Sequence, residues 1–279
     1  MYHTKKYDLL CENGLLSFQP YLERNNSTYR ELFPNTAALA GIISEVYEVD
    51  DFDDRKNIAL PDICADIMTF YTDNECYNYF MGGAATIQKM NELSFMPMVK
   101  TIFGVRLRTG ALGNLFRFGL KDIGNCQIPM RDTFYDGRVL EEKMAEASTF
   151  EERWDTIAQY FIDQMRKNIY DKNILINYVV KRIKESNGNI KIQDLAADTG
   201  YSDRYLRRVV KTSLGVSMKQ FEEVTKFQWM CNYHQNKHGQ VELSDLAIQA
   251  GYYDQSHMNL CCKRLTGELP TEIFGLYSA

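Results

Sequence analysis

The sequence lacks the features of several protein classes. No apolar run approaches the roughly 20 residues that a membrane-crossing helix needs, and the first ten residues, MYHTKKYDLL, contain no signal-peptide core. The seven cysteines include no CxxC pair. Their odd number fits a reducing compartment better than a disulfide framework. These absences predict a cytoplasmic protein without membrane contact.

Groups that carry chemistry are also scarce. Of the four histidines only His3 lies within residues 1–171, whereas a metal-dependent cupin needs several histidines around its ion. Cys231, His234 and His238 have spacings of three and four that can gather metal ligands, but no fourth ligand is evident nearby. The sequence shows neither a nucleophile-and-base arrangement nor a phosphate-binding loop. We therefore expect no enzyme activity, no cofactor and no metal.

The charge is divided unevenly along the chain. A length of 279 residues is enough for two domains. Residues 1–171 hold 18 basic and 26 acidic residues, a balance of −8, while residues 172–279 hold 14 and 11, a balance of +3. We expect domains at 1–170 and 171–279. Attraction to phosphate is local at physiological salt, so a basic C-terminal domain can bind nucleic acid although the whole chain is acidic.

Residues 192–215, IQDLAADTGYSDRYLRRVVKTSLG, have the pattern of two short helices joined by a tight turn. Gly200 can adopt the left-handed backbone that ends a helix, and Ser202 is a good cap for the next one. The outer face of that second helix is basic: Arg204, Arg207, Arg208 and Lys211. The pattern predicts a helix-turn-helix that can enter the major groove of DNA, although a basic surface helix can also be simply solvated.

The pattern occurs a second time, in LSDLAIQAGYYDQSHMNLCCKRLTGELP. Gly251 follows Gly200 by 51 residues, but Gly267 follows Gly215 by 52. The second copy therefore has one extra residue in or near its turn, and Asp254 takes the capping place of Ser202. Residues from Ser217 to about Gln235 predict a long helix that joins the two copies.

Two helix-turn-helix units joined by one long helix resemble the AraC-type transcriptional regulators. The resemblance covers roughly residues 172–279 and implies that outward residues of each recognition helix contact DNA. Carried over by position, these are Arg204, Arg207 and Arg208 in the first unit and Gln255, Ser256 and Asn259 in the second. Lys211 and Lys263 are also predicted to bind DNA. The second unit departs from the family because Leu260 replaces a usual arginine and Cys262 a core aromatic. Leucine cannot donate to guanine or phosphate, so this unit should bind more weakly or read thymine methyl groups.

The N-terminal domain is expected to be mostly antiparallel β structure with one or two helices, which gives an α+β chain with an all-α C-terminal domain. Strands are predicted within residues 39–49, 60–72, 77–81 and 100–107, and a glycine-rich bend follows the last of them. The segments LPDICADIMTFY and FGVRLRTGALGNLF are similar to the N-terminal domain of a subgroup of AraC-type regulators. Ile63 and Thr109 stand there for the usual glycine and proline.

Two arginines on one predicted strand admit two interpretations. Arg106 and Arg108 can point to solvent or pair with acids, or one of them can fix an anionic effector, because the guanidinium fork suits carboxylates and phosphates. Tyr71 and Tyr79 could line such a ligand-binding pocket, or they could simply be core residues.

Residues 150–168 predict an amphipathic helix with Trp154, Ile157, Ala158, Phe161 and Met165 along one stripe. The stripe can pack on its own β domain or pair with a second chain.

Together these features predict a sequence-specific transcriptional regulator. Its partners would be double-stranded DNA, a small-molecule effector, RNA polymerase and a second copy of the chain. The rival interpretation is a small-molecule binding protein or enzyme whose helical domain docks a protein partner.

Overall fold

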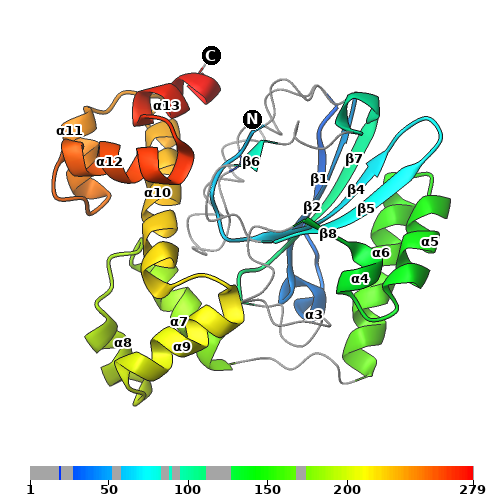
Figure 1. Cartoon of the computed structure of the whole chain (residues 1–279), viewed down its shortest axis with the longest axis horizontal. Coiled ribbons are helices and arrows are strands. Elements are labelled where there is room, and N and C mark those ends of the chain that lie inside the picture. Colours follow the sequence, from blue (N-terminus) through cyan, green and yellow to red (C-terminus); the bar gives the residue numbers. More distant parts are fainter. Residues whose placement is uncertain are drawn as a thin grey trace.

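The computed structural model describes residues 19, 28–51, 58–82, 88–89, 95–110, 127–167 and 174–278. Figure 1 shows a β-rich N-terminal part with helices on it, beside a helical C-terminal part. The expected α+β class is therefore confirmed. The predicted domain boundary at residue 170 lies outside the described residues and stays a prediction.

An antiparallel sheet forms the centre of the N-terminal part. Its strands are β1 (Arg30–Leu32), β2 (Ile43–Asp50), β4 (Ala65–Tyr71), β5 (Cys76–Met81), β7 (Thr101–Leu107) and β8 (Gln127–Pro129). Their order is β1-β2-β7-β4-β5-β8, and every neighbouring pair is antiparallel. A separate pair joins β3 (Ile58–Ala59) to β6 (Gln88–Lys89).

The predicted strands differ from the observed ones at their ends. Residues 39–49 contain the end of a short helix, α3 (Ala37–Ala40), before β2 begins, since the alanine-rich flank favours helix. Residues 60–64 are not a strand, because Ile63 has a left-handed backbone with φ of +56° that interrupts the extended chain. The glycine-rich bend after β7 lies outside the described residues beyond Gly110.

Alternating side chains give the sheet two apolar faces. One face packs on α4 (Met130–Thr133), α5 (Gly137–Glu146) and α6 (Phe150–Arg166), and its core includes Phe103, Val105 and Phe161. Figure 1 shows these helices on the side of the sheet away from the C-terminal helices. The other face places Phe70 and Ile102 against Phe95, which precedes the short helix η3 (Met96–Met98).

The amphipathic stripe of α6 packs on its own domain, so the first of the two interpretations of this helix is confirmed. Ile157 and Phe161 are fully buried against the sheet, and Trp154 packs partly buried beside them. The helix begins at a capping box in which Thr149 and Glu152 satisfy each other's backbone N–H groups.

The C-terminal part consists of helices grouped around one long helix. They are α7 (Ile174–Glu185), α8 (Ile192–Thr199), α9 (Asp203–Leu214), α10 (Met218–Asn236), α11 (Leu243–Gln249), α12 (Gln255–Thr266) and α13 (Pro270–Ser278). The long helix α10 starts at a capping box of Ser217 and Gln220. It buries Phe221, Val224 and Phe227 and contacts α7 and α9 on one side and α11, α12 and α13 on the other. The predicted connecting helix is thus confirmed. None of the helices in the described ranges is long and apolar enough to cross a membrane.

The two parts meet through the segment before β4. Leu60 and Ile63 are buried in the hydrophobic core of the C-terminal helices rather than in the sheet. Gln228 Nε2 of α10 donates to the carbonyl oxygen of Pro61 over 2.8 Å, and Lys184 Nζ of α7 donates to Thr109 Oγ1 over 3.4 Å. A β-branched residue in the left-handed region costs about 1–2 kcal/mol, so the core contact of Ile63 must offset that strain.

Candidate nucleic-acid interface

The first helix-turn-helix unit has the predicted geometry. Gly200 ends α8 with φ of +72°, and Ser202 Oγ accepts a hydrogen bond from the backbone N–H of Tyr205 over 3.3 Å. A Cβ at Gly200 would meet no atom within 4 Å, so the position needs glycine for its backbone angle rather than for space. Both ends of the turn are therefore fixed by local chemistry.

The recognition helix of this unit, α9, presents cations to solvent. On the inner face of this helix, Leu206 and Val210 are fully buried. The opposite face is exposed and carries Arg204, Arg207, Arg208 and Lys211. Lys211 Nζ donates to the carbonyl oxygen of Gly215 over 2.8 Å, at the end of the helix. The structure thus brings the four predicted residues together on one accessible face.

Two tyrosines that the sequence analysis did not select belong to the same face. Tyr201 and Tyr205 are stacked with ring centroids 4.8 Å apart. The Arg208 guanidinium lies 5.0 Å from the centroid of the Tyr205 ring, within the range of a cation–π contact. Tyr205 and Arg208 are three residues apart on α9, a spacing that places side chains side by side on a helix. That spacing could have indicated their contact from the sequence, whereas Tyr201 precedes the Ser202 cap and has no such signal.

The second unit repeats this geometry with one difference. Gly251 has φ of +80°, and Asp254 Oδ1 accepts a hydrogen bond from the backbone N–H of His257 over 2.7 Å. One residue separates the glycine from the cap in the first unit, but two separate them here, Tyr252 and Tyr253. The extra residue therefore lies inside the turn. Tyr252 is buried, whereas Tyr253 is 85% exposed.

The outer face of α12 carries less charge than that of α9. Ser256 and Lys263 are exposed, while Gln255 and Asn259 are half-buried. Within the described part of the chain, the buried Oδ1 of Asn259 has no hydrogen-bond partner. Of the four residues of this unit predicted to bind DNA, Ser256 and Lys263 are therefore the more accessible.

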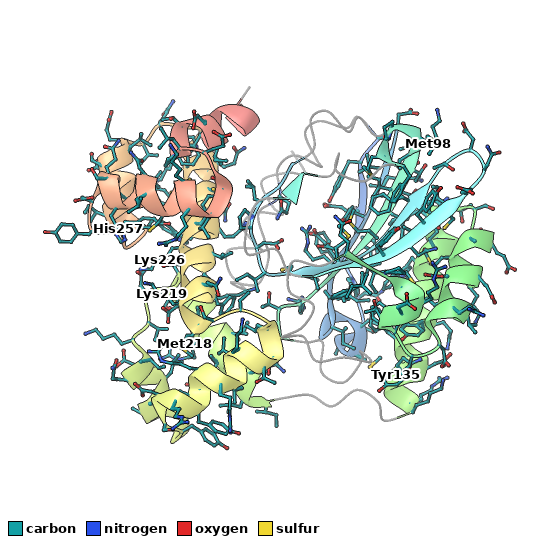
Figure 2. All side chains as sticks on the ribbon, viewed as in Figure 1. Met98, Tyr135, Met218, Lys219, Lys226 and His257 are labelled. Carbon is teal, nitrogen blue, oxygen red and sulfur yellow. The ribbon has the colours of Figure 1, made fainter. Side chains whose placement is uncertain are left out.

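Leu260 lies in the middle of this outer face with 66% of its surface exposed. The neighbouring Arg264 is paired with Glu223 of α10 over 2.9 Å, so its charge is partly engaged within the protein. Figure 2 shows His257 of α12, with Lys219 and Lys226 of α10, on the side of the helical part that faces away from the sheet. The described residues of the N-terminal part therefore do not cover this side.

The three residues with metal-ligand spacing lie in different environments. Cys231 and His234 are buried in the helical core, where the His234 ring stacks on Phe274 with centroids 3.8 Å apart. Burial lowers the pKa of His234. His238 is exposed in the turn after α10.

Arg106 pairs with acids, as the first interpretation of this residue expected. It is buried on the sheet, with Nη1 2.9 Å from Glu45 Oε1 and Nε 3.1 Å from Asp66 Oδ1. Asp62 Oδ2 lies 3.9 Å from the same Nε. Burial alone would lower the pKa of Arg106, but these carboxylates raise it well above the ordinary value. Its fork is thus occupied by protein groups.

The other three candidates for effector binding are not gathered around Arg106. Tyr71 packs against the helix-covered face, where its hydroxyl donates to the carbonyl oxygen of Met144 over 2.8 Å. Tyr79 packs on the opposite face and stacks on Phe95 with centroids 5.8 Å apart. Arg108 is half-buried, and its Nε donates to the carbonyl oxygen of Ala40. The four side chains therefore do not line one pocket.

Arg108 lies instead at the junction of the two parts of the chain. Its Nη1 is buried without a hydrogen-bond partner among the described residues, and burial lowers its pKa. The nearby Lys184 also has a pKa lowered by burial and by the charge of Arg108, although Cys64 and Asp62 act in the opposite direction. Two cations thus face a region where parts of both domains meet.

Comparison with known proteins supports the geometry of the two units. Residues 195–275 match a family model described as a helix-turn-helix domain. A search of curated proteins finds no match.

Several solved structures are similar over most of the chain. A structure of ToxT from Vibrio cholerae is 11% identical with a TM-score of 0.42, covering 90% of this chain and 99% of that one. ToxT bound to (E)-4-(8-methylnaphthalen-1-yl)but-3-enoic acid is 10% identical with a TM-score of 0.40, covering 90% and 100%. Unsaturated fatty acid bound ToxT is 12% identical with a TM-score of 0.40, covering 90% and 96%. The identification of the C-terminal part as a DNA-binding domain depends on the helix-turn-helix match and on the geometry of the two units, and not on these solved structures.

Proposed function

We propose that this chain is an AraC-type DNA-binding transcriptional regulator that anchors on its site through the first helix-turn-helix unit. The observation that carries the proposal is the exposed cationic face of α9 on a helix fixed by Gly200 and Ser202. Arg204, Arg207 and Arg208 can donate to guanine O6 and N7 or to phosphates, and Lys211 to phosphates. Stacking of Arg208 on Tyr205 limits the guanidinium's freedom before DNA arrives, which lowers the entropy cost of binding.

The second unit contributes a weaker contact to the same duplex. Of its predicted DNA-binding residues, the accessible ones are Ser256, which supplies a hydroxyl group, and Lys263, which supplies a cation. Leu260 supplies neither a hydrogen-bond donor nor a charge. Because α10 contacts helices of both units, it holds the recognition helices at a fixed separation. Successive major grooves on one face of DNA are about 34 Å apart, and this is the separation that binding requires.

Control by a small molecule acts through the junction of the two parts. An anionic effector would find two donors there, Arg108 and Lys184, and the charge of Arg108 acts against that of Lys184. Binding at this place would change the population of one interdomain arrangement, because Lys184 belongs to α7 of the DNA-binding part. Lys184→Met should then remove the response to the effector while leaving binding without effector unchanged.

The remaining partners follow from the resemblance to AraC-type regulators. They are RNA polymerase at the promoter and a second copy bound through the N-terminal domain. Since the apolar stripe of α6 is occupied by its own sheet, a dimer must use another surface. Sedimentation of the purified protein at several concentrations tests this part. We also propose a cytoplasmic location and a regulatory rather than a catalytic role.

Selection from random duplex DNA with the purified full-length protein tests the proposal. We expect one enriched sequence, with footprints at two places about one helical turn apart on the same face. The rival function, an enzyme or small-molecule binding protein with a partner-docking helical domain, predicts no enrichment together with turnover or tight ligand binding. If no sequence is enriched, either in buffer alone or with small molecules from a cell extract added, the proposed regulatory function is wrong.

A further inference from the structure

The exposed side of the second recognition helix carries a line of three side chains that differs in chemistry from the first. His257 and Leu260 are three residues apart on α12, which places them on one side of the helix. Tyr253 precedes the Asp254 cap, and its backbone N–H is bonded to the His257 ring. All three are exposed, Tyr253 by 85% and Leu260 by 66%. In the first unit Tyr205 occupies the position of His257, since each follows its capping residue by three. The line therefore presents one polar ring between two large apolar groups.

The protonation site of the His257 ring is fixed by its surroundings. The backbone N–H of Tyr253 donates to His257 Nδ1 over 3.2 Å. A ring nitrogen that accepts a hydrogen bond carries no proton, so the neutral imidazole holds its proton on Nε2. The ring also lies edge-on to Tyr252, with centroids 5.7 Å apart. His257 thus offers an oriented N–H donor from an exposed position in the first turn of the recognition helix.

A donor beside an apolar group matches one base in the major groove. Thymine presents the O4 acceptor next to its C5 methyl group, whereas cytosine presents a donor and no methyl group. Guanine presents two acceptors, and adenine an acceptor and a donor, and neither has a methyl group. Leu260 lies one turn beyond His257, so donor and apolar surface reach neighbouring positions on the groove floor. Thymine alone satisfies both.

We propose that His257 and Leu260 together select thymine in the second half of the DNA site. His257 Nε2–H donates to O4, and the Leu260 side chain covers the C5 methyl group. This inference depends on the proposed DNA-binding function and states what its second unit recognises. A phosphate contact by His257 is the alternative, and it would add affinity without sequence preference.

Base analogues separate the two contacts. Starting from the sequence enriched by the full-length protein, each thymine of the half-site bound by the second unit is replaced by uracil, which lacks the methyl group but keeps O4. In a second series it is replaced by 5-methylcytosine paired with guanine, which keeps the methyl group but replaces O4 by a donor. Fluorescence anisotropy gives the Kd of each duplex for the wild type, Leu260→Ala and His257→Phe.

Each substitution has a distinct expected result. Uracil should weaken wild-type binding about fourfold, the ratio that corresponds to ~0.8 kcal/mol for one buried methylene-sized group. Leu260→Ala should lose this sensitivity. 5-Methylcytosine should weaken wild-type binding by at least about fivefold, as expected for one lost hydrogen bond, and His257→Phe should lose that preference while keeping sensitivity to uracil. Circular dichroism checks that the His257 variant is folded, and Leu260→Ala tests the methyl contact independently.

A matched control lies on the neighbouring helix. Ile248 of α11 is also an exposed aliphatic residue, with 61% exposure, outside the recognition helix, so Ile248→Ala should keep the full uracil sensitivity. An enriched site in which no thymine of this half responds to uracil or 5-methylcytosine would overturn the inference and leave the regulator intact. Equal weakening of all duplexes by His257→Phe, including random ones, would assign His257 to a phosphate. If no sequence is enriched at all, the proposed function fails instead.

Discussion

Gln228, in the middle of α10, donates a hydrogen bond to the backbone carbonyl of Pro61, 167 positions earlier in the chain, over 2.8 Å. The acceptor belongs to the N-terminal part, while the donor belongs to the helix that holds both recognition helices. Leu60 and Ile63, on either side of this carbonyl, are buried in the helical core. The N-terminal part is thus connected to the element that sets the spacing of the DNA-binding units.

Shortening Ile63 tests this connection. Ile63→Ala should lower the free energy of unfolding of the helical part by about 2–4 kcal/mol, because it leaves a cavity in that core. The chain's two tryptophans allow a direct reading, since Trp229 packs against the helical core and Trp154 against the sheet. In a Trp154→Phe background, Trp229 fluorescence follows the urea unfolding of the helical part. The midpoint of this transition should move to a lower urea concentration.

A matched control is Ile67→Ala, in the core beneath the sheet. It should destabilise the part that Trp154 reports, read in a Trp229→Phe background. If Ile63→Ala affected only the transition seen by Trp154, Ile63 would belong energetically to the sheet.

Removing an arginine from α9 tests the anchoring unit. Arg207→Ala or Arg208→Ala should cost about 1–3 kcal/mol of binding free energy on the enriched site if the guanidinium pairs with a base. Anisotropy titrations on the enriched and on a random duplex measure this. Lys143→Ala, which removes one exposed cation from α5 of the N-terminal part, should leave both affinities unchanged. Equal losses on the two duplexes would mean a phosphate contact.

Adding an arginine at Leu260 tests the account of the second unit. Leu260→Arg places a cation on an already exposed position. It gives up the methyl contact, worth ~0.8 kcal/mol, but an arginine contact with guanine is worth about 1–3 kcal/mol, so gel-shift titrations should show tighter binding. The slope of log K against log salt should steepen by about one if the new cation neutralises a phosphate. An unchanged affinity and slope would refute the view that Leu260 is what weakens this unit.

The buried carboxyl of Asp66 predicts a pH dependence of stability. Burial raises its pKa to about 7, although Arg106 acts in the opposite direction. The folded protein therefore favours the protonated form, and this contribution is complete below the unfolded pKa of about 4 and is lost as pH rises to about 7. The cost of ionisation amounts to as much as ~4 kcal/mol.

Asp66→Asn keeps an oxygen that can accept from Arg106 Nε but cannot ionise. Between pH 4.5 and 8, the free energy of unfolding of the wild type should fall relative to that of the variant. Urea midpoints at several pH values measure the difference. A constant difference across this range would show that Asp66 ionises at an ordinary pH.

Local signals made the DNA-binding part predictable from sequence. Gly200, Ser202, Gly251 and Asp254 act on the backbone next to them, so their residue types alone indicate the turns and caps. The exposed face of α9 follows from helical spacing in the same way. In the second unit, spacing also indicates the outward side, but it could not show that Asn259 is half-buried.

The N-terminal part depended more on distant contacts, and prediction was weaker there. The partners of Arg106 come from β2 and from the start of β4, so only the register of the strands brings them together. Ile63 has an apolar side chain that fits a strand pattern, but its contact with helices more than 100 residues later has no local signature. The lysine at the junction, Lys184, is part of an otherwise ordinary amphipathic helix.

Because Leu60 and Ile63 are buried in it, the core of the helical part includes two side chains from outside residues 174–278. A truncated protein that begins at Ile174 would have a gap in its interior and would expose the apolar surface around it. The helices of that fragment would therefore be packed less tightly than in the intact chain, unless a peptide with the missing side chains were added.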